Sequence, residues 1–326
     1  MTTKTPAGAR ERAPRAEPST QARAGGPYAL EIEHLTKRYG DNTVVDDLSF
    51  TAQPGRVTGF LGPNGSGKST TMKIMLDLAS ADQGRATIGG HRYRDLPDPA
   101  RTVGAVIESD AFHPGRSGRN HLQILADATG IPHARVDQVL EQVDLADAAD
   151  RRAGAYSLGM RQRLGLAAAL LGEPVVLVLD EPGNGLDPQG IRTLRDLLRA
   201  HAAAGGTVFV SSHLLAEVEH LADDVIVIDK GRMITQGSLA ELQQAASLAR
   251  TADPARLAAV VEREGAVTQI TPDGVIITDM PIDEIGERAF TAGIVLHELS
   301  PRAGSLEELF LGWTTDPTAA GEGIRP

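Results

Sequence analysis

The sequence of 326 residues contains no cysteine, and aromatic residues make up only 3% of it. The absence of cysteine excludes disulfides, thiolate metal sites and a cysteine nucleophile. The shortage of aromatic side chains argues against a surface on which nucleic-acid bases stack, and the net charge of -11 argues against a general nucleic-acid binder. These absences leave a globular protein whose 41% of hydrophobic residues can build a core.

No apolar run in the sequence is long enough to span a bilayer. The most apolar stretch, residues 164–179, is interrupted by Gly172, Glu173 and Pro174. The start of the chain is rich in arginine and proline and has no apolar segment after it, so it does not resemble a secretory signal. A role in membrane transport would therefore need a second protein that supplies the pore.

The chain divides into three parts by composition and periodicity. Residues 1–27 have no periodicity, which predicts a disordered tail. Short apolar runs alternate with helical patterns across residues 28–240, which predicts an α/β core around a parallel sheet, interrupted by a helical insertion at about residues 112–171. Residues 241–326 indicate a small C-terminal α/β appendage with a closing helix at 306–313. It carries no chemical motif. Regulation, dimerisation and stabilisation are its possible roles, and stabilisation is the simplest.

A glycine-rich loop lies between an apolar run at residues 57–61 and a helical pattern at 69–78. The order of strand, loop and helix is typical of the P-loop of nucleotide-binding proteins. The loop fits G-x-x-x-x-G-K-[ST] and consists of Gly62, Pro63, Asn64, Gly65, Ser66, Gly67, Lys68, Ser69 and Thr70. Glycines let backbone N–H groups close around phosphate oxygens at the positive end of the following helix. We expect Lys68 to reach the outer phosphates and the Ser69 hydroxyl to hold Mg²⁺.

A second motif follows a buried strand. Residues 175–179 are continuously apolar, as in parallel sheets, and Asp180 and Glu181 come directly after them. Beside a phosphate loop, Asp180 would hold Mg²⁺ through water, and Glu181 would polarise the attacking water as a general base. Alone, the same pair could mark only the edge of a sheet.

A third segment, residues 156–163, leads into a helical pattern. Ser157 is suited to cap this helix, which is a structural role, and a helix N-terminus also attracts phosphate. By itself the segment is weak evidence for any function.

Together these motifs resemble the nucleotide-binding domain of ABC transporters. The phosphate loop is followed by segment 156–163, the Asp-Glu strand end, Asp187 and finally His213. The resemblance covers about residues 28–240, and more narrowly points to a bacterial branch linked to antibiotic export and self-resistance. It implies an ATPase that works at the cytoplasmic face of the cell membrane as a peripheral subunit. It would power a separate polytopic permease that exports a drug, an antibiotic or a peptide.

The resemblance also implies a homodimer, or a pair with another ABC subunit, with two ATP molecules between the domains. Ser157 and Gly159 would contact the γ-phosphate of the ATP held by the other subunit, and Asp187 would lie at the dimer seam. His213 would contact the γ-phosphate, and Tyr39 would stack on adenine. As lone residues, His213 would more often be a capping or core histidine and Tyr39 ordinary packing. No nucleic acid is expected as a partner.

Two segments depart from the family pattern. The usual signature is Leu-Ser-Gly-Gly-Gln, of which this chain keeps Ser157 and Gly159. Leu158 and Met160 differ. The family places a Gln that senses Mg²⁺ and the membrane partner ahead of the helical insertion, and Glu108 stands there in this chain. A carboxylate can ligate Mg²⁺, so we expect Glu108 to replace the Gln; a solvated loop acid is the alternative.

Two other classes of protein remain as alternatives. A soluble ABC-type ATPase of the ribosome or DNA would carry two nucleotide domains, a long coiled coil or a zinc module, whereas this chain has one phosphate loop and no cysteine. A phosphate-loop kinase or GTPase would need neither the signature segment nor the acidic pair. Binding to ribosomes or DNA would support the first class, and phosphoryl transfer to a small molecule the second.

Overall fold

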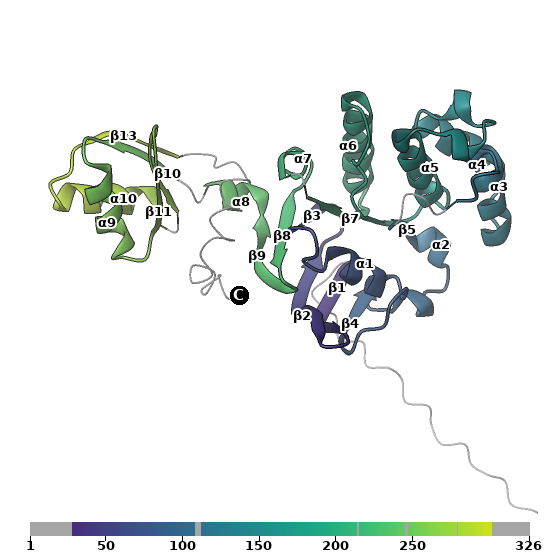
Figure 1. Cartoon of the computed structure of the whole chain (residues 1–326), viewed down its shortest axis with the longest axis horizontal. Coiled ribbons are helices and arrows are strands. Elements are labelled where there is room, and N and C mark those ends of the chain that lie inside the picture. Colours follow the sequence, from purple (N-terminus) through teal and green to yellow (C-terminus); the bar gives the residue numbers. More distant parts are fainter. Residues whose placement is uncertain (1–27, 108–111, 214, 245–246, 279, 302–326) are drawn as a thin grey trace, which may run out of the picture.

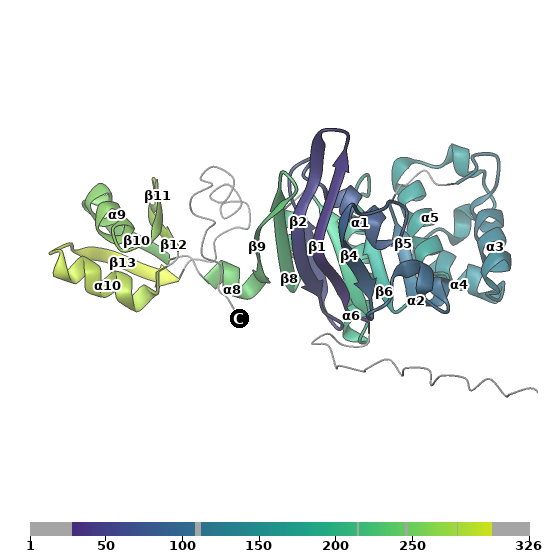
Figure 2. The same ribbon diagram turned by 90° about the horizontal axis from the view of Figure 1, so that it is seen from below.

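The computed structural model describes five stretches of the chain, which are residues 28–107, 112–213, 215–244, 247–278 and 280–301. The expected tail at 1–27, Glu108 and the expected closing helix at 306–313 lie outside these residues. The described residues form a core of two sheets with a helical lobe, followed by a smaller unit made of one sheet and two helices (Figures 1 and 2).

The core is centred on a six-stranded sheet in the order β5-β6-β7-β3-β8-β9. Five strands run parallel, and β9 pairs antiparallel with β8 at the edge. The strands are β3 (Val57–Leu61), β5 (Val103–Val106), β6 (Val176–Leu179), β7 (Thr207–Ser212), β8 (Asp224–Asp229) and β9 (Arg232–Ser238). Every residue of β3, β6 and β7 is buried, as expected for strands covered on both faces. The predicted α/β core with a parallel sheet is confirmed.

A second, antiparallel sheet packs on the first through aromatic rings. It has the order β2-β1-β4 and contains β1 (Leu30–Tyr39), β2 (Asn42–Ala52) and β4 (Gln83–Ile88). Phe50 on β2 stacks on Phe209 of β7 at 5.5 Å between ring centroids, and Phe60 of β3 lies 5.1 Å from Phe209. Helix α1 (Lys68–Met75) packs into the same cluster. The two sheets therefore hold the segment between β3 and α1 in a rigid frame.

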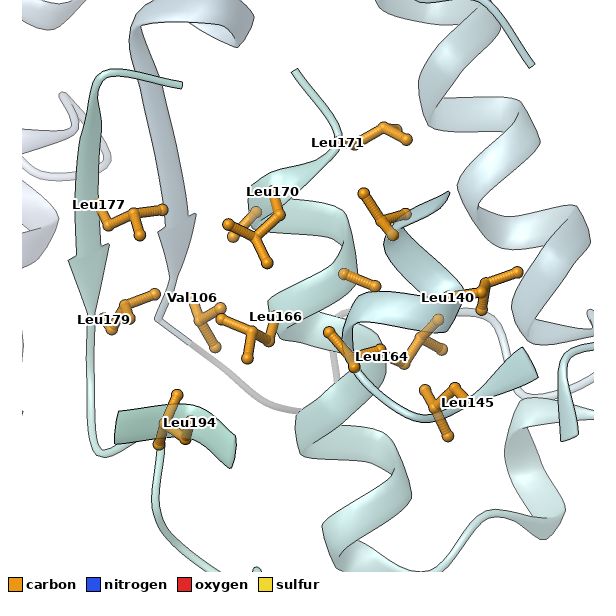
Figure 3. Close-up of a cluster of buried hydrophobic side chains, with 14 of the residues drawn as sticks. Val106, Leu140, Leu145, Leu164, Leu166, Leu170, Leu171, Leu177, Leu179 and Leu194 are labelled. Carbon is orange, nitrogen blue, oxygen red and sulfur yellow. The ribbon is translucent and has the colours of Figure 1, made fainter. Parts of the chain in front are cut away.

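A helical lobe lies beside the sheet, between β5 and β6 in the chain (Figure 1). It contains α3 (Gly118–Thr129), α4 (Ala134–Gln142) and α5 (Leu158–Leu170), and α2 (Pro99–Thr102) precedes β5. Figure 3 shows how α5 connects the lobe to the sheet: Leu164 lies towards Leu140 of α4, and Leu166 lies towards Val106 of β5. Helix α5 therefore packs on β5, the strand beside β6, and the acidic pair follows β6.

Helix α6 (Pro188–Ala203) begins at a well-formed N-terminal cap. Asp187 Oδ1 accepts a hydrogen bond from Gly190 N at 2.8 Å, and Pro188 occupies the first turn, where its missing N–H costs nothing. The cap and the proline together define where this helix begins. Short helices α7 (Leu215–Glu219) and α8 (Leu239–Gln244) follow β7 and β9.

The smaller unit has its own sheet and core. The sheet is antiparallel in the order β11-β12-β10-β13, and α9 and α10 pack on it (Figure 2). The elements are β10 (Ser247–Thr251), α9 (Pro254–Glu262), β11 (Val267–Thr271), β12 (Gly274–Thr278), α10 (Ile282–Thr291) and β13 (Leu296–Pro301). Leu257, Val261 and Ile277 are fully buried in its core. The predicted C-terminal α/β appendage is confirmed. Across the described residues, no helix has the length and apolar character needed to cross a bilayer.

Candidate nucleotide site

The loop between β3 and α1 contains glycines whose neighbours leave no room for a side chain. A Cβ on Gly62 would lie 2.4 Å from the Ile228 carbonyl oxygen and 2.5 Å from Ser66 Oγ. Gly67 has a φ of 107°, and a Cβ there would lie 2.6 Å from the carbonyl oxygen of Val44. The left-handed backbone and the close approach both require glycine. The loop is thus held in one shape by the strands around it.

Lys68 lies buried under this loop. Its Nζ donates to the carbonyl oxygens of Gly62 at 2.6 Å and Pro63 at 3.1 Å. Burial lowers the pKa of Lys68, and the charges of Glu181 and Asp180 oppose that shift. A buried ammonium beside a helix N-terminus forms a cradle for an anion.

One polar atom of the loop points to the same conclusion. Ser66 Oγ is buried and finds no hydrogen-bond partner among the described residues. Buried hydroxyls are usually paired, so an unpaired one at this place fits a missing ligand. The residues of the loop therefore suit a bound phosphate chain.

The acidic pair extends from the end of β6 at the same edge of the sheet. Glu181 Oε2 accepts hydrogen bonds from Asn184 Nδ2 at 2.6 Å and from His213 Nδ1 at 2.7 Å. His213 follows β7, the neighbour of β6 and β3, so three parallel strands bring Lys68, Asp180, Glu181 and His213 to one end of the sheet. Open α/β sheets bind ligands at this carboxyl end.

The donor set at this edge fits Mg²⁺. Ser69 is exposed at the start of α1, and Asp180 is partly exposed at the end of β6. Mg²⁺ prefers oxygen ligands and is commonly held by one or two protein groups with phosphates and waters. In keeping with that, the described residues contain no cluster of three or more His, Asp or Glu that could enclose a metal. Glu108, the third expected ligand, lies outside the described residues.

The signature segment packs onto the loop that follows Glu181. Ser157 Oγ accepts from Met160 N at 3.3 Å, which confirms its predicted role as the N-cap of α5. A Cβ on Gly159 would lie 2.7 Å from the Gly185 carbonyl oxygen, so glycine is needed there. Leu158 replaces a glycine of the usual signature, and its side chain is half exposed. If Gly185 carried a Cβ, that atom would contact the Leu158 side chain. The altered signature residue is therefore accommodated by the glycine opposite.

Tyr39 and Asp187 lie at the periphery of this region. The Tyr39 side chain at the end of β1 is 54% exposed, and Lys37 Nζ lies 5.1 Å from its ring centroid. Asp187 caps α6 and also accepts a bond of 3.5 Å from Arg163 Nη2. Stacking of Tyr39 on adenine and a place for Asp187 at a dimer seam stay predictions.

Sequence reasoning gave no role to four residues that contact the acidic pair or its loop. They are Gln162, Asn184, Ser211 and Glu217. The carboxylate of Glu217 on α7 lies against Gly183, and burial raises its pKa. The spacing of Asn184, three residues after Glu181 in a turn, could have indicated a local contact. The other three contacts depend on packing between distant elements.

Comparisons with known proteins identify the family of this chain. A family model described as ABC transporter matches residues 45–184. The chain is 43% identical over 208 residues to the uncharacterized ABC transporter ATP-binding protein YhcH of Bacillus subtilis, covering 63% of this chain and 68% of that protein. The chain belongs to the ABC transporter ATP-binding family. Members of the family bind and hydrolyse ATP, so the predicted ATPase class is confirmed.

Other relatives of the ABC protein extend this result. Bacitracin transport ATP-binding protein BcrA of Enterococcus faecalis is 40% identical over 67% of this chain and 71% of its own length. The ABC transporter ATP-binding protein YdbJ of Bacillus subtilis is 35% identical over 90% of this chain and 97% of its own length. A solved structure titled as an ATP binding subunit of an ABC transporter matches with a TM-score of 0.60 and 28% identity, over 66% of this chain and 91% of that chain.

The relatives named for transport favour a transport function over a ribosomal or DNA-acting ATPase. Membership of the ABC family excludes a phosphate-loop kinase or GTPase. A second family model, described as a domain of unknown function (DUF8746), matches residues 247–307. The smaller unit of this ABC protein is therefore a module that other proteins share.

Proposed function

We propose that this ABC ATPase powers the export of an antibiotic, a drug or a peptide through a separate polytopic membrane permease. Relatives named for bacitracin transport and lantibiotic transport, at 40% and 37% identity, support export. The subunit would bind its permease at the cytoplasmic face of the membrane as a peripheral protein, with no nucleic acid as a partner. We also propose residues 1–27 as a tail, 28–240 as the ATP-binding domain and 241–326 as an accessory region.

The loop 62–70 would surround the phosphates of ATP, and Tyr39 would stack on the adenine. Lys68 would exchange its bonds to the loop carbonyls for charge-assisted hydrogen bonds to the outer phosphates. Mg²⁺, held by Ser69, Asp180 and Glu108 in this proposal, would neutralise charge on the phosphates.

Glu181 is the proposed general base, and its carboxylate geometry carries the proposal. Both described hydrogen bonds to its carboxylate, from Asn184 and His213, end on Oε2. No described residue bonds Oε1, which leaves this oxygen to accept a proton from the attacking water. His213 would hold the base in place and contact the γ-phosphate.

The second half of each site is proposed to come from another subunit. Ser157 is exposed at the N-terminus of α5, where the helix dipole favours a negatively charged group. In a homodimer or a pair with another ABC subunit, Ser157 and Gly159 would contact the γ-phosphate across the interface, and Asp187 would lie at the seam. The fold of this chain also matches a dimeric ATP-binding cassette bound to ADP and phosphate, with a TM-score of 0.59.

Replacement of Glu181 tests the catalytic part of the proposal. We expect Glu181→Gln to lower ATP hydrolysis by about 100-fold or more while ATP binding survives, since the amide cannot accept the proton. An ATP-bound dimer should accumulate, which size-exclusion chromatography with ATP would show. Undiminished hydrolysis would remove Glu181 as the base.

Transport itself requires the membrane partner. We expect a polytopic membrane protein to co-purify with the tagged chain from solubilised membranes. Inside-out vesicles that contain both proteins should then take up a peptide antibiotic only when ATP is supplied, and the Glu181→Gln variant should abolish uptake. Uptake that ignores ATP, or a chain that purifies with ribosomes and no membrane protein, would contradict the export proposal.

A further inference from the structure

Glu181 has a backbone conformation that is unusual for its residue type. Its φ is 48°, in the left-handed region that favours glycine. A glutamate persists in this conformation only when its surroundings hold it there, and such positions gather at functional sites. The conformation sets the direction in which the carboxylate leaves the end of β6.

The N–H side of Glu181 is held from the neighbouring strand. Ser211 is fully buried near the end of β7, which pairs in parallel with β6. Its Oγ accepts a hydrogen bond from Glu181 N at 2.9 Å and donates one to Asp180 Oδ1 at 2.5 Å. A serine hydroxyl can donate one bond and accept others, so a single side chain fixes both acidic residues.

The C=O side of Glu181 is held from the helical lobe. Gln162 is buried on α5, and its Nε2 donates to the Glu181 carbonyl oxygen at 3.1 Å. The same helix begins at Ser157. Side chains from two different parts of the core thus hold the two ends of one residue.

We propose that Ser211 and Gln162 are positioning residues that hold Glu181 in its left-handed conformation and so aim its carboxylate at the attacking water. This inference rests on the proposed role of Glu181 as the base. Neither residue touches the reacting atoms; each acts through the backbone of Glu181, and Ser211 also through Asp180. Because Gln162 lies on the helix that begins with the signature segment, a shift of that helix would reach the base directly.

The test uses Ser211→Ala and Gln162→Met, which remove one hydrogen-bonding group each at similar volume. A misplacement of about 1 Å of a catalytic group can cost about 100-fold in rate. We therefore expect kcat for ATP hydrolysis to fall by about 10-fold to 100-fold in each variant. KM for ATP should change by less than about twofold in Gln162→Met, which alters neither the phosphate loop nor the bond to Asp180. Ser211→Thr keeps the hydroxyl and should recover most of the rate.

Two controls separate positioning from general damage. Thr58→Val removes a buried hydroxyl of β3 that has no hydrogen-bond partner among the described residues, and it should leave kcat and the melting temperature unchanged. The second control compares the double variant Glu181→Gln/Gln162→Met with Glu181→Gln alone. Its hydrolysis rate in single turnover should be lower by less than about twofold, because both substitutions act on the carboxylate of Glu181.

Each result decides the inference. If Ser211→Ala and Gln162→Met hydrolyse ATP at the wild-type rate while Glu181→Gln is inactive, the positioning role is wrong and the base stands. If Glu181→Gln itself is active, the proposed base fails first. If the two variants lower kcat and raise KM together with a large loss of melting temperature, their role is structural and the inference is overturned. If Ser211→Thr does not fold, Gln162→Met alone decides in the same way.

Discussion

The core and the smaller C-terminal unit of this ABC protein are stabilised by different means. Eleven of the twelve buried polar or charged residues that the structure describes lie in the core, and Ser247 is the exception. All seven non-glycine residues with positive φ among the described residues, Glu181 among them, also lie in the core. The unit at 247–301 instead packs an apolar cluster between one sheet and two helices.

This difference indicates that the core carries the chemistry of the site and that the smaller unit contributes to stability. Buried polar groups and left-handed backbone cost free energy, and they persist where a site needs them. At the carboxyl end of the parallel sheet, the core combines the buried Ser66, Lys68 and Ser211 with the left-handed backbone of Glu181. Among the described residues, the unit at 247–301 contains one buried polar residue and no left-handed residue other than glycine. Changes there should therefore alter stability and leave hydrolysis intact.

Loss of the buried ammonium should have the largest effect. Lys68→Ala removes the charge that would contact the outer phosphates, and we expect kcat/KM for ATP to fall by about 100-fold to 1,000-fold. Steady-state hydrolysis and titration with a fluorescent nucleotide would measure it. Lys73→Ala, on the same helix, is the matched control and should stay within about threefold of the wild type. Equal losses in both variants would contradict a special role for Lys68.

A methyl group on Gly62 should have the next largest effect. It would lie 2.4 Å from the Ile228 carbonyl oxygen, so Gly62→Ala must displace the loop. We expect nucleotide affinity to fall by more than about 10-fold and the free energy of unfolding to fall by about 1–3 kcal/mol. Gly237→Ala on β9 is the control, because its Cβ would meet its nearest neighbour at an ordinary 3.7 Å. Wild-type affinity in Gly62→Ala would show that the loop is free to move.

These two predictions concern features that the sequence alone could supply. The loop motif, the strand before it and the buried strand ahead of Asp180 all depend on local pattern, and the structure has each of them. β4 was not predicted because its first three residues, Gln83, Gly84 and Arg85, are all exposed, so the strand lacks a clear alternation of buried and exposed residues. β5 has only four residues, which is too short for a period to show.

The contacts around Glu181 could not be predicted for a different reason. Gln162 precedes Glu181 by 19 residues and Ser211 follows it by 30, so the three meet only after the sheet and α5 have packed together. Nothing in the local sequence of Glu181 indicates a left-handed backbone either. That conformation is imposed by its partners, which are visible only in three dimensions.

A cavity in the smaller unit should change stability without changing catalysis. Ile277 is fully buried in its core, and Ile277→Ala should lower the free energy of unfolding of that unit by about 2–4 kcal/mol. Hydrolysis should stay within about twofold of the wild type if the unit only stabilises or docks. Phe290→Ala is the control, since that side chain is 86% exposed and its loss leaves no cavity. A large fall in kcat for Ile277→Ala, measured beside thermal unfolding, would break the contrast between the two regions.

The smallest effect should appear on acidification, and only in the core. Burial lowers the pKa of His201 on α6, so the folded chain resists a proton that the unfolded chain accepts near its ordinary pKa of about 6.5. The unfolded state then binds more protons, and core stability should fall as pH drops from about 7.5 to about 5.5. His201→Gln should flatten this dependence, as followed by thermal unfolding across that range. A wild-type slope in His201→Gln would show that the burial of His201 does not set the pH response.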